Sequence, residues 1–288
     1  MTTNLIILAG GASSRMKSSL SHNLDTTHIE QANTRSKALI LLNDRPMLDY
    51  ILYNAKQAGI IDVFIVVSPT DNLFKTYYGA NSSGNQFHGL TISYAVQKIP
   101  NDRSKPLGTA DAVLQTLEQY PELQSESFLV CNCDNLYSSN AIRSLSMVVT
   151  PNALINYDRD SLKYSSERIA RFALTKVNSQ NMLEDIIEKP SENEMESYCG
   201  LDGSFRVSMN IFKFDGSMFY QYLKSCPLHP DRNEKELPTA LLNMIKDHPE
   251  STLCIPFSEH VPDLTSKEDI SIMNEYLTSR YPNLDWNN

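Results

Sequence analysis

The sequence predicts an α/β protein whose central sheet is largely parallel. Between residues 5 and 131, apolar runs of strand length alternate with segments that place apolar residues at helical spacing. Gly10-Gly11 follows the first apolar run and Gly59 follows the first helical segment, as expected for turns. A strand, a helix and a second strand in this order build a parallel sheet with right-handed crossovers, so the alternation predicts the fold class.

The first predicted unit is a strand, a helix and a strand. Residues 5–9 are apolar and end at Gly10-Gly11, which suits a central strand covered on both faces. A helix is expected at residues 47–58, where Gly59 follows as a stop signal. The apolar run at residues 61–67 completes the unit. Further elements are expected as a strand at 90–96, a helix at 109–119 and a strand at 127–131.

The alternation loosens in the second half of the chain, where extended segments follow one another with few helices between them. This pattern predicts a mixed sheet that widens into a second lobe. The extended segments are residues 153–157, 170–177, 183–188, 204–214 and 252–256. The helices expected among and after them are residues 218–224, 235–246 and 267–279.

Composition restricts the class of protein. The 288 residues are 41% apolar, enough for a sizeable core, and carry a formal net charge of -9 with no strongly basic block. A nucleic-acid partner is therefore not expected, although a local cluster of cations can still bind phosphate. The odd number of cysteines, the lack of an export pattern and the lack of a membrane-spanning apolar stretch favour a cytoplasmic protein without membrane contact.

A glycine-rich turn follows the first strand in the segment Leu8-Ala9-Gly10-Gly11-Ala12-Ser13-Ser14-Arg15-Met16. Small side chains allow backbone N–H groups to approach phosphate oxygens, and a guanidinium can neutralise their charge. The segment matches neither the dinucleotide motif G-x-G-x-x-G nor the lysine ending of a P-loop. Taken alone, it is compatible with an ordinary turn as well as with a phosphate-binding one.

Gln97 ends one predicted strand, and Gly108-Thr109-Ala110 opens the next predicted helix. The amide of Gln97 can pair with the polar edge of a base, and Gly108 allows a close approach of backbone. The structural alternative is that Thr109 caps the helix and Asp111 lies near the positive end of its dipole.

The strand at 127–131 leads into Asn132-Cys133-Asp134-Asn135 and delivers a carboxylate at its C-terminal end. Ligands of open α/β sheets bind at this edge. The D-x-D motif of glycosyltransferases is a rival interpretation, but the triplet 132–134 lacks its first carboxylate. Cys131 and Cys133 have no second pair at metal-binding spacing, so a zinc site is not expected.

Together these segments resemble the nucleotidyltransferases that activate sugar 1-phosphates. Residues 8–16 match the pattern L-A-G-G-x-x-x-R-M of that family, and residues 37–47 match K-x-L-x-x-x-x-x-x-P-M. Residues 188–190 match E-K-P, and residues 260–269 resemble W-x-D-[VIT]-G-[TS]-P-E-D. The resemblance runs from residue 5 to about residue 269. It implies a Rossmann-like three-layer α/β/α nucleotidyltransferase fold with a mixed, mainly parallel central sheet.

The resemblance also implies roles for residues at matching positions. Arg15 and Lys37 would hold the triphosphate and stabilise charge at the transferred phosphorus, and Lys189 would reach the sugar phosphate. Asp134 and Asp263 would bind the catalytic Mg²⁺. The implied nucleotide-binding residues are Leu8, Ala9, Gly10, Gly11, Gln97, Gly108 and Thr109. The implied sugar-binding residues are Glu188, Ser208 and Asn210.

The chain departs from the family pattern at several positions. Ser208 and Asn210 replace the asparagine and glycine of the strand pattern N-x-G-[IV]-[YF], so the sugar contacts of this strand are in question. Residues 17–35 form a polar insertion between Arg15 and Lys37 with little apolar periodicity. We expect this insertion to be a lid or a surface loop. An insertion without a role in activity is equally compatible with the sequence. His22 and His28 are expected to be solvated.

The activity implied by the resemblance is Mg²⁺-dependent transfer of a nucleotidyl group from a nucleoside triphosphate to a sugar 1-phosphate, with release of pyrophosphate. Two alternatives stay open. One is a related enzyme acting on a polyol, choline or cofactor-precursor phosphate, and the other is a catalytically inactive regulatory homologue. Retention of both metal carboxylates and the phosphate-binding cations argues against the inactive homologue.

The expected organisation is a catalytic domain at residues 1–265 and a helical extension at residues 266–288. Within the domain, we expect the nucleotide part at about residues 1–135 and the sugar part at about residues 136–265. The extension shows no hexapeptide repeat of a left-handed β-helix, and its helix is available for contacts in a homo-oligomer. The base, the sugar and the oligomeric state stay open.

Overall fold

The computed structural model describes residues 1–20, 24–188, 190–200 and 203–287. The chain divides into two compact units that interleave along the sequence. Unit 1 contains residues 1–2, 107–130 and 143–261, and unit 2 contains residues 3–106, 131–142 and 262–288. The functional division expected near residue 135 stays a prediction, because these units are defined by packing alone.

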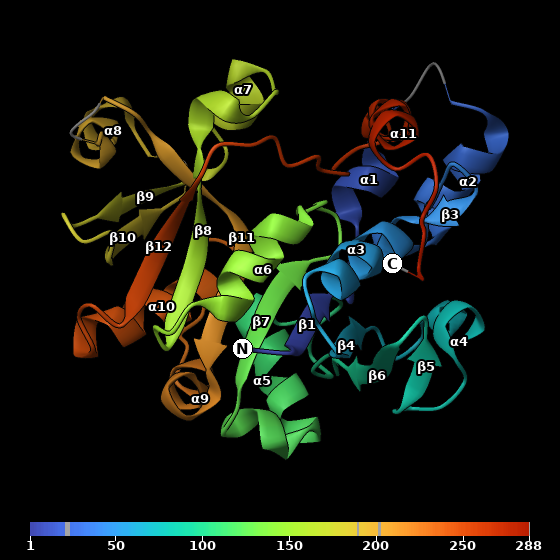
Figure 1. Ribbon diagram of the computed structural model, residues 1–288, viewed down its shortest axis with the longest axis horizontal. Helices are drawn as coiled ribbons and strands as arrows, with labels where there is room; N and C mark the ends of the chain where they lie inside the picture. Colours follow the sequence, from blue (N-terminus) through green and yellow to red (C-terminus); the bar gives the residue numbers. More distant parts are fainter. Residues whose placement is uncertain (21–23, 189, 201–202, 288) are drawn as a thin grey trace. The chain divides into compact units, whose positions relative to one another are not determined.

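Unit 2 is built on parallel strands, coloured blue to teal in Figure 1. β1 (Asn4–Leu8) pairs in parallel with β4 (Asp62–Val67), which pairs in parallel with β6 (Leu90–Val96). β5 (Asn85–Phe87) adds to β6 in the antiparallel direction. Leu5, Ile6 and Ile7 on β1 are fully buried, as expected for a strand covered on both faces. The predicted parallel strands are confirmed.

The helices of unit 2 include the predicted one after the first strand, α3, and the predicted C-terminal one, α11. These are α3 (Met47–Gln57) and α11 (Asp269–Arg280). The other elements are shorter: α1 (Ser14–Ser18), α2 (Thr26–Thr34), a 3-10 turn at Lys37–Leu39, β2 (Leu41–Leu42), β3 (Arg45–Pro46) and α4 (Leu73–Tyr78).

The insertion between Arg15 and Lys37 contains helix α2, contrary to the expected loop. Asp25 caps this helix by accepting a hydrogen bond from the backbone N–H of His28, and its carboxylate also contacts the His28 ring. His28 is therefore paired and half-buried, contrary to the prediction, whereas His22 lies outside the described residues. Within α2 only Gln31 and Ala32 are buried, so the apolar periodicity that signals a helix is missing from the sequence.

Unit 1 mixes antiparallel and parallel strands. β11 (Arg206–Asp215) pairs antiparallel with β8 (Asn152–Asp158) and with β9 (Ala173–Val177). β10 (Leu183–Ile187) pairs antiparallel with β9, and β12 (Thr252–Phe257) pairs in parallel with β8. The mixed sheet predicted for the second half of the chain is confirmed. β7 (Ser127–Asn132), whose residues 127–130 belong to this unit, neighbours β11.

Three predicted helices of unit 1 pack against one another: α5 (Thr109–Gln119), α9 (Gly216–Lys224) and α10 (Leu237–Asp247). Their buried apolar residues include Val113, Phe219 and Leu241. α6 (Ser139–Met147), which belongs partly to each unit, α7 (Ser166–Ile169) and α8 (Glu192–Met195) were not expected. Short 3-10 turns lie at Pro121–Gln124, Arg159–Ser161 and Glu196–Tyr198. No helix in the described part of the chain has the length and apolar character to cross a membrane.

Candidate active site

Lys37 and Asp134 are far apart in the sequence but form an ion pair within unit 2. The Nζ atom of Lys37 lies 2.8 Å from Oδ2 of Asp134, and the Lys37 residue is only 7% exposed. Burial alone disfavours the charged ammonium, but the carboxylates of Asp134 and, more weakly, Asp263 outweigh it. The pKa of Lys37 is therefore raised above its usual value, and the ammonium stays charged.

Asp263 lies on a segment that pairs with the residues around Asp134. Asn135 and Asp263 form an isolated antiparallel bridge, and the N–H of Leu264 donates to the carbonyl of Asp134 at 2.8 Å. The hydroxyl of Thr265 donates to Oδ2 of Asp263 at 2.7 Å. The two carboxylates predicted as metal ligands thus lie on adjacent backbone segments.

The donor set of this site fits Mg²⁺. Mg²⁺ binds oxygen ligands and is commonly held by one or two carboxylates, with substrate phosphates completing its coordination. Among the described residues, no group of three or more His, Cys, Asp or Glu side chains is arranged to hold a metal. Burial raises the pKa of the Cys133 thiol to about 12, which disfavours a thiolate ligand.

The glycine-rich turn lies beside Gln97. A Cβ atom placed on Gly10 would lie 3.5 Å from Oε1 of Gln97, whose side chain is buried, whereas a Cβ on Gly11 would meet nothing within 4 Å. The hydroxyl of Ser36 donates to the carbonyl of Ala9 at 3.1 Å and so connects the turn to the segment that carries Lys37. Unit 2 thereby gathers several of the residues predicted to bind the nucleotide.

Arg15 lies on α1 with an exposed side chain, and Leu8 at the end of β1 is half-buried. Ser13, just before α1, adopts a left-handed backbone conformation with φ of 53°. The Arg15 guanidinium makes no ion pair with any residue that the structure describes. An exposed arginine after a small-residue turn can bind a phosphate group.

In unit 1, the turn at Gly108 and Thr109 packs against the backbone before α10. Gly108 has φ of 116°, and a Cβ atom there would lie 2.4 Å from the carbonyl oxygen of Lys235. The same carbonyl accepts a hydrogen bond from the N–H of Ala110 at 2.9 Å. The predicted helix start is confirmed, but the N-cap residue is Gly108 and Thr109 is the first helical residue. The Thr109 hydroxyl accepts a hydrogen bond from the N–H of Leu237.

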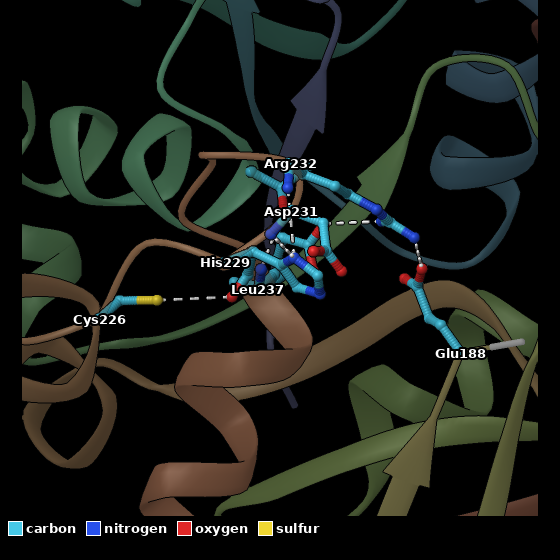
Figure 2. Close-up of polar contacts among 8 residues, drawn as sticks. Glu188, Cys226, His229, Asp231, Arg232 and Leu237 are labelled. Carbon is cyan, nitrogen blue, oxygen red and sulfur yellow. Dashed lines mark hydrogen bonds and ion pairs between the residues drawn. The ribbon is translucent and has the colours of Figure 1, made fainter. Parts of the chain in front are cut away.

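Glu188 forms an ion pair with Arg232. Figure 2 shows Arg232 reaching from the loop before α10 to the carboxylate of Glu188, and its other nitrogen lies 2.6 Å from Oε1 of Glu236. Nδ1 of His229 accepts hydrogen bonds from the N–H groups of Asp231 and Arg232 and so orders this loop. No local motif marks Arg232. Lys189 lies outside the described residues.

The two unusual residues of β11 have different environments. Ser208 is 3% exposed, and its Oγ accepts a hydrogen bond from the N–H of Asn210 at 3.2 Å. Asn210 is exposed and has φ of 59°, at a point where the pairing of β11 with β8 changes register. Asparagine tolerates the left-handed conformation better than most residues, which explains how it replaces the glycine of the family pattern.

Comparisons with known proteins identify relatives over nearly the whole chain. Residues 4–260 match the family described as "Nucleotidyl transferase". The bifunctional protein GlmU of Staphylococcus epidermidis is 24% identical over 256 residues, which are 86% of this chain and 46% of that protein. The glucose-1-phosphate thymidylyltransferase of Neisseria meningitidis is 28% identical over 188 residues, 64% of this chain and 55% of that protein.

A third relative, the D-glycero-α-D-manno-heptose 1-phosphate guanylyltransferase of Campylobacter jejuni, is 30% identical over 113 residues, 39% of this chain and 41% of that protein. The chain spans about half the length of the curated relatives it matches. Among solved structures, UDP-glucose pyrophosphorylase complexed with UDP-glucose superposes with a TM-score of 0.72 at 16% identity, covering 97% of this chain and 100% of that one. This similarity confirms the predicted fold.

Proposed function

The chain belongs to the nucleotidyl transferase family, and from this premise we propose that it transfers a nucleotidyl group from a nucleoside triphosphate to a sugar 1-phosphate. Relatives named for transfer to heptose 1-phosphate and glucose 1-phosphate support the acceptor class. The observation that carries the proposal is the cluster of Lys37, Asp134 and Asp263 in unit 2, where a buried cation and two carboxylates converge. Such a cluster suits phosphoryl chemistry better than a structural role.

In the proposed reaction, a phosphate oxygen of the sugar 1-phosphate attacks the α-phosphorus of the triphosphate. A new phosphorus–oxygen bond forms as pyrophosphate departs in line, so no protein nucleophile is needed. Arg15 and Lys37 stabilise the charge that develops on the departing pyrophosphate. Lys37 suits this role because the neighbouring carboxylates keep it charged despite its burial.

Asp134 and Asp263 would hold Mg²⁺, which when bound neutralises phosphate charge and aligns the reacting oxygens. The hydrogen bond from Thr265 fixes one oxygen of Asp263, and the pairing of residues 134–136 with 262–264 fixes the backbone of both ligands. Local cations and a metal are needed here because the protein is acidic overall, with a net charge of -9 that repels nucleotide phosphates.

The remaining predicted residues complete the substrate contacts. Gln97 beside Gly10 would read the base, and the open space at Gly11 suits a phosphate or ribose oxygen. Glu188, whose carboxylate is oriented by its ion pair with Arg232, would accept hydrogen bonds from sugar hydroxyls. Lys189 would hold the sugar phosphate. On β11 the exposed Asn210 is the better candidate for a sugar contact, since Ser208 is buried.

Compartment and assembly are also part of the proposal. All five cysteines are free thiols, four of them buried, which supports a reducing compartment such as the cytoplasm. A homo-oligomer with contacts through the C-terminal helix stays a prediction that gel filtration with light scattering would check.

The decisive experiment measures pyrophosphate release with purified protein and Mg²⁺ across a matrix of nucleoside triphosphates and sugar 1-phosphates. Release that requires one nucleotide together with one sugar phosphate would establish the reaction and name both substrates. Release only with a polyol, choline or cofactor-precursor phosphate would replace the acceptor class. If no combination releases pyrophosphate, a regulatory protein is favoured. Omission of Mg²⁺ should abolish release.

Asp134→Asn tests the metal assignment. The amide keeps the shape of the side chain and can still accept a hydrogen bond from Lys37, so the fold should persist by circular dichroism. Loss of the charge should lower kcat by at least about a hundredfold. Turnover near the wild-type value would contradict the role of Asp134 as a metal ligand.

A further inference from the structure

Lys267 has a buried side chain that binds the end of helix α1 within unit 2. The residue is 5% exposed, and its Nζ atom donates to the carbonyl oxygens of Lys17 at 3.0 Å and Ser19 at 2.7 Å. Its backbone N–H donates to the hydroxyl oxygen of Ser19 at 3.0 Å. Three hydrogen bonds therefore join Lys267 to residues 17–19, where α1 ends.

The segment that carries Lys267 is itself braced around Asp263. Oδ2 of Asp269 accepts hydrogen bonds from the backbone N–H groups of Thr265 at 2.9 Å and Ser266 at 2.6 Å. Thr265 in turn donates its hydroxyl to Asp263. The backbone of the segment between Asp263 and Lys267 is thus held by Asp269, and Thr265 links it to the side chain of Asp263.

The chemistry of this contact is specific to lysine or arginine. The last carbonyl groups of a helix have no partner inside the helix, and a basic side chain can satisfy them. A buried ammonium in turn requires such acceptors, because an unpaired buried charge is strongly unfavourable. The family pattern W-x-D-[VIT]-G-[TS]-P-E-D, aligned on Asp263, has proline at position 267, which offers no donor for these carbonyls.

The position of the contact explains why this chain needs it. Lys17 and Ser19 lie at the start of the insertion at 17–35, which begins in the last turn of the helix that carries Arg15. Without an anchor at this point, motion of the insertion would be transmitted to α1 and to the glycine-rich turn that precedes α1.

We propose that Lys267 is a positioning residue for the nucleotide: it ties the segment bearing Asp263 to the end of α1 and thereby holds Arg15 and the glycine-rich turn in place. The kinetic part of this inference rests on the proposed function, because only a nucleotide-using enzyme has a triphosphate for Arg15 to bind. The structural part, the coupling of α1 to residues 263–269, stands without it.

Lys267→Met tests the proposal, because methionine keeps most of the volume and removes the charge and all side-chain donors. Hydrogen exchange should quicken at the backbone amides of residues 15–20. The KM for the nucleoside triphosphate should rise about tenfold or more, while the KM for the sugar 1-phosphate stays within about twofold. Lys267→Arg should restore most of the nucleotide affinity, since a guanidinium can donate to both carbonyls.

Lys213→Met is the matched control. Lys213 is also 5% exposed, and its Nζ donates to the carbonyls of Val148 at 2.7 Å and Thr150 at 2.9 Å, but it lies in unit 1. This variant should lose stability to a similar extent and leave both exchange at residues 15–20 and the KM for the triphosphate unchanged.

If the backbone amides of residues 15–20 exchange at the wild-type rate in the Lys267→Met variant, the proposal is overturned. An equal rise of both KM values, or the same kinetic change in Lys213→Met, would overturn it as well, since either would reveal a general loss of stability. If the wild-type protein neither binds a nucleoside triphosphate nor releases pyrophosphate, the proposed function fails instead. The exchange measurement then still decides whether Lys267 holds α1.

Discussion

Two glycines predicted to bind the nucleotide are glycine for different physical reasons. A side chain at Gly108 would collide with the carbonyl of Lys235, and its φ of 116° is one that other residues rarely adopt. Gly11 has neither constraint, since a Cβ atom there would meet nothing within 4 Å and its φ is not in the left-handed range. The first glycine is required by the fold, whereas the second is free to serve a ligand.

Replacement of each glycine by alanine should separate these roles. Gly108→Ala should lower the free energy of unfolding by at least about 2 kcal/mol, because it adds both backbone strain and a collision. Gly11→Ala should leave the melting temperature unchanged and raise the KM for the nucleoside triphosphate severalfold. Thermal denaturation and steady-state kinetics measure both effects. A wild-type KM in Gly11→Ala would mean that the nucleotide does not approach this turn.

Residues that belong to local motifs could be found from the sequence, and residues that act from a distance could not. Lys37, Asp134 and Asp263 each lie in a recognisable pattern, but their proximity depends on pairing between segments far apart in the chain. Arg232 contacts Glu188 from a loop without any motif, and only the fold brings the two side chains together. Lys267 is a departure from its motif, and its partners are visible only in the structure.

Among the elements, β11 shows how one residue shapes a strand. The N–H of Asn210 donates to Ser208, and the left-handed backbone at Asn210 coincides with the change of register against β8. A residue in this conformation bends and twists the strand locally. The alternation of apolar residues in β11 predicts a strand but does not reveal the irregularity within it.

Substitution at Asn210 should reveal this backbone requirement. Asn210→Ala should destabilise the protein by about 1 kcal/mol, because a left-handed backbone conformation costs more free energy for alanine than for asparagine or glycine. Asn210→Gly should be close to neutral in stability, and denaturant midpoints at equal m-values measure both. If the alanine variant is as stable as the wild type, β11 does not impose this conformation. A change in the KM for the sugar phosphate in the glycine variant would report a contact from the asparagine side chain itself.

Strong apolar periodicity predicts an element almost to its ends, whereas short elements escape prediction. α3 and α5 each bury a continuous apolar face, and their observed bounds agree closely with the expected ones. α2 buries only Gln31 and Ala32, whereas α4 (Leu73–Tyr78) buries Phe74 and Tyr78 but has fewer than two turns. α2 lacks an apolar face, and α4 is too short to repeat one, so hydrophobic patterning does not mark either segment as a helix.

At the scale of the whole molecule, interleaved packing is beyond the reach of local sequence patterns. Residues 107–130 belong to unit 1 and residues 131–142 to unit 2, although no change in composition separates them. The sequence predicts the order of the strands and helices, since each depends on neighbouring residues. Which elements pack together depends on contacts that are distant in the chain, so local patterns do not mark where the chain passes from one unit to the other.

Acid stability is a property of the whole molecule to which His260 should contribute. The half-buried ring of His260 accepts a hydrogen bond at Nδ1 from the N–H of Lys163 and lies edge-on to Tyr164. Burial first, and the nearby charges of Lys163 and Arg168 second, lower the pKa of His260 from 6.5 to about 4. Between these two values the unfolded chain binds a proton that the folded protein does not, so the stability from this group is complete above pH 6.5 and falls as the pH falls toward 4.

His260→Gln removes this titration and keeps an acceptor for the N–H of Lys163. Relative to the variant, the wild type should lose about 1 to 2 kcal/mol of unfolding free energy between about pH 7.5 and about pH 4.5, a range that allows for the partial exposure of the ring. Urea unfolding of both proteins at several pH values measures the difference, and the other titrating groups cancel in the comparison. A constant difference across this range would mean that His260 titrates alike in the folded and unfolded states, and that its surroundings in unit 1 do not exclude the charged ring.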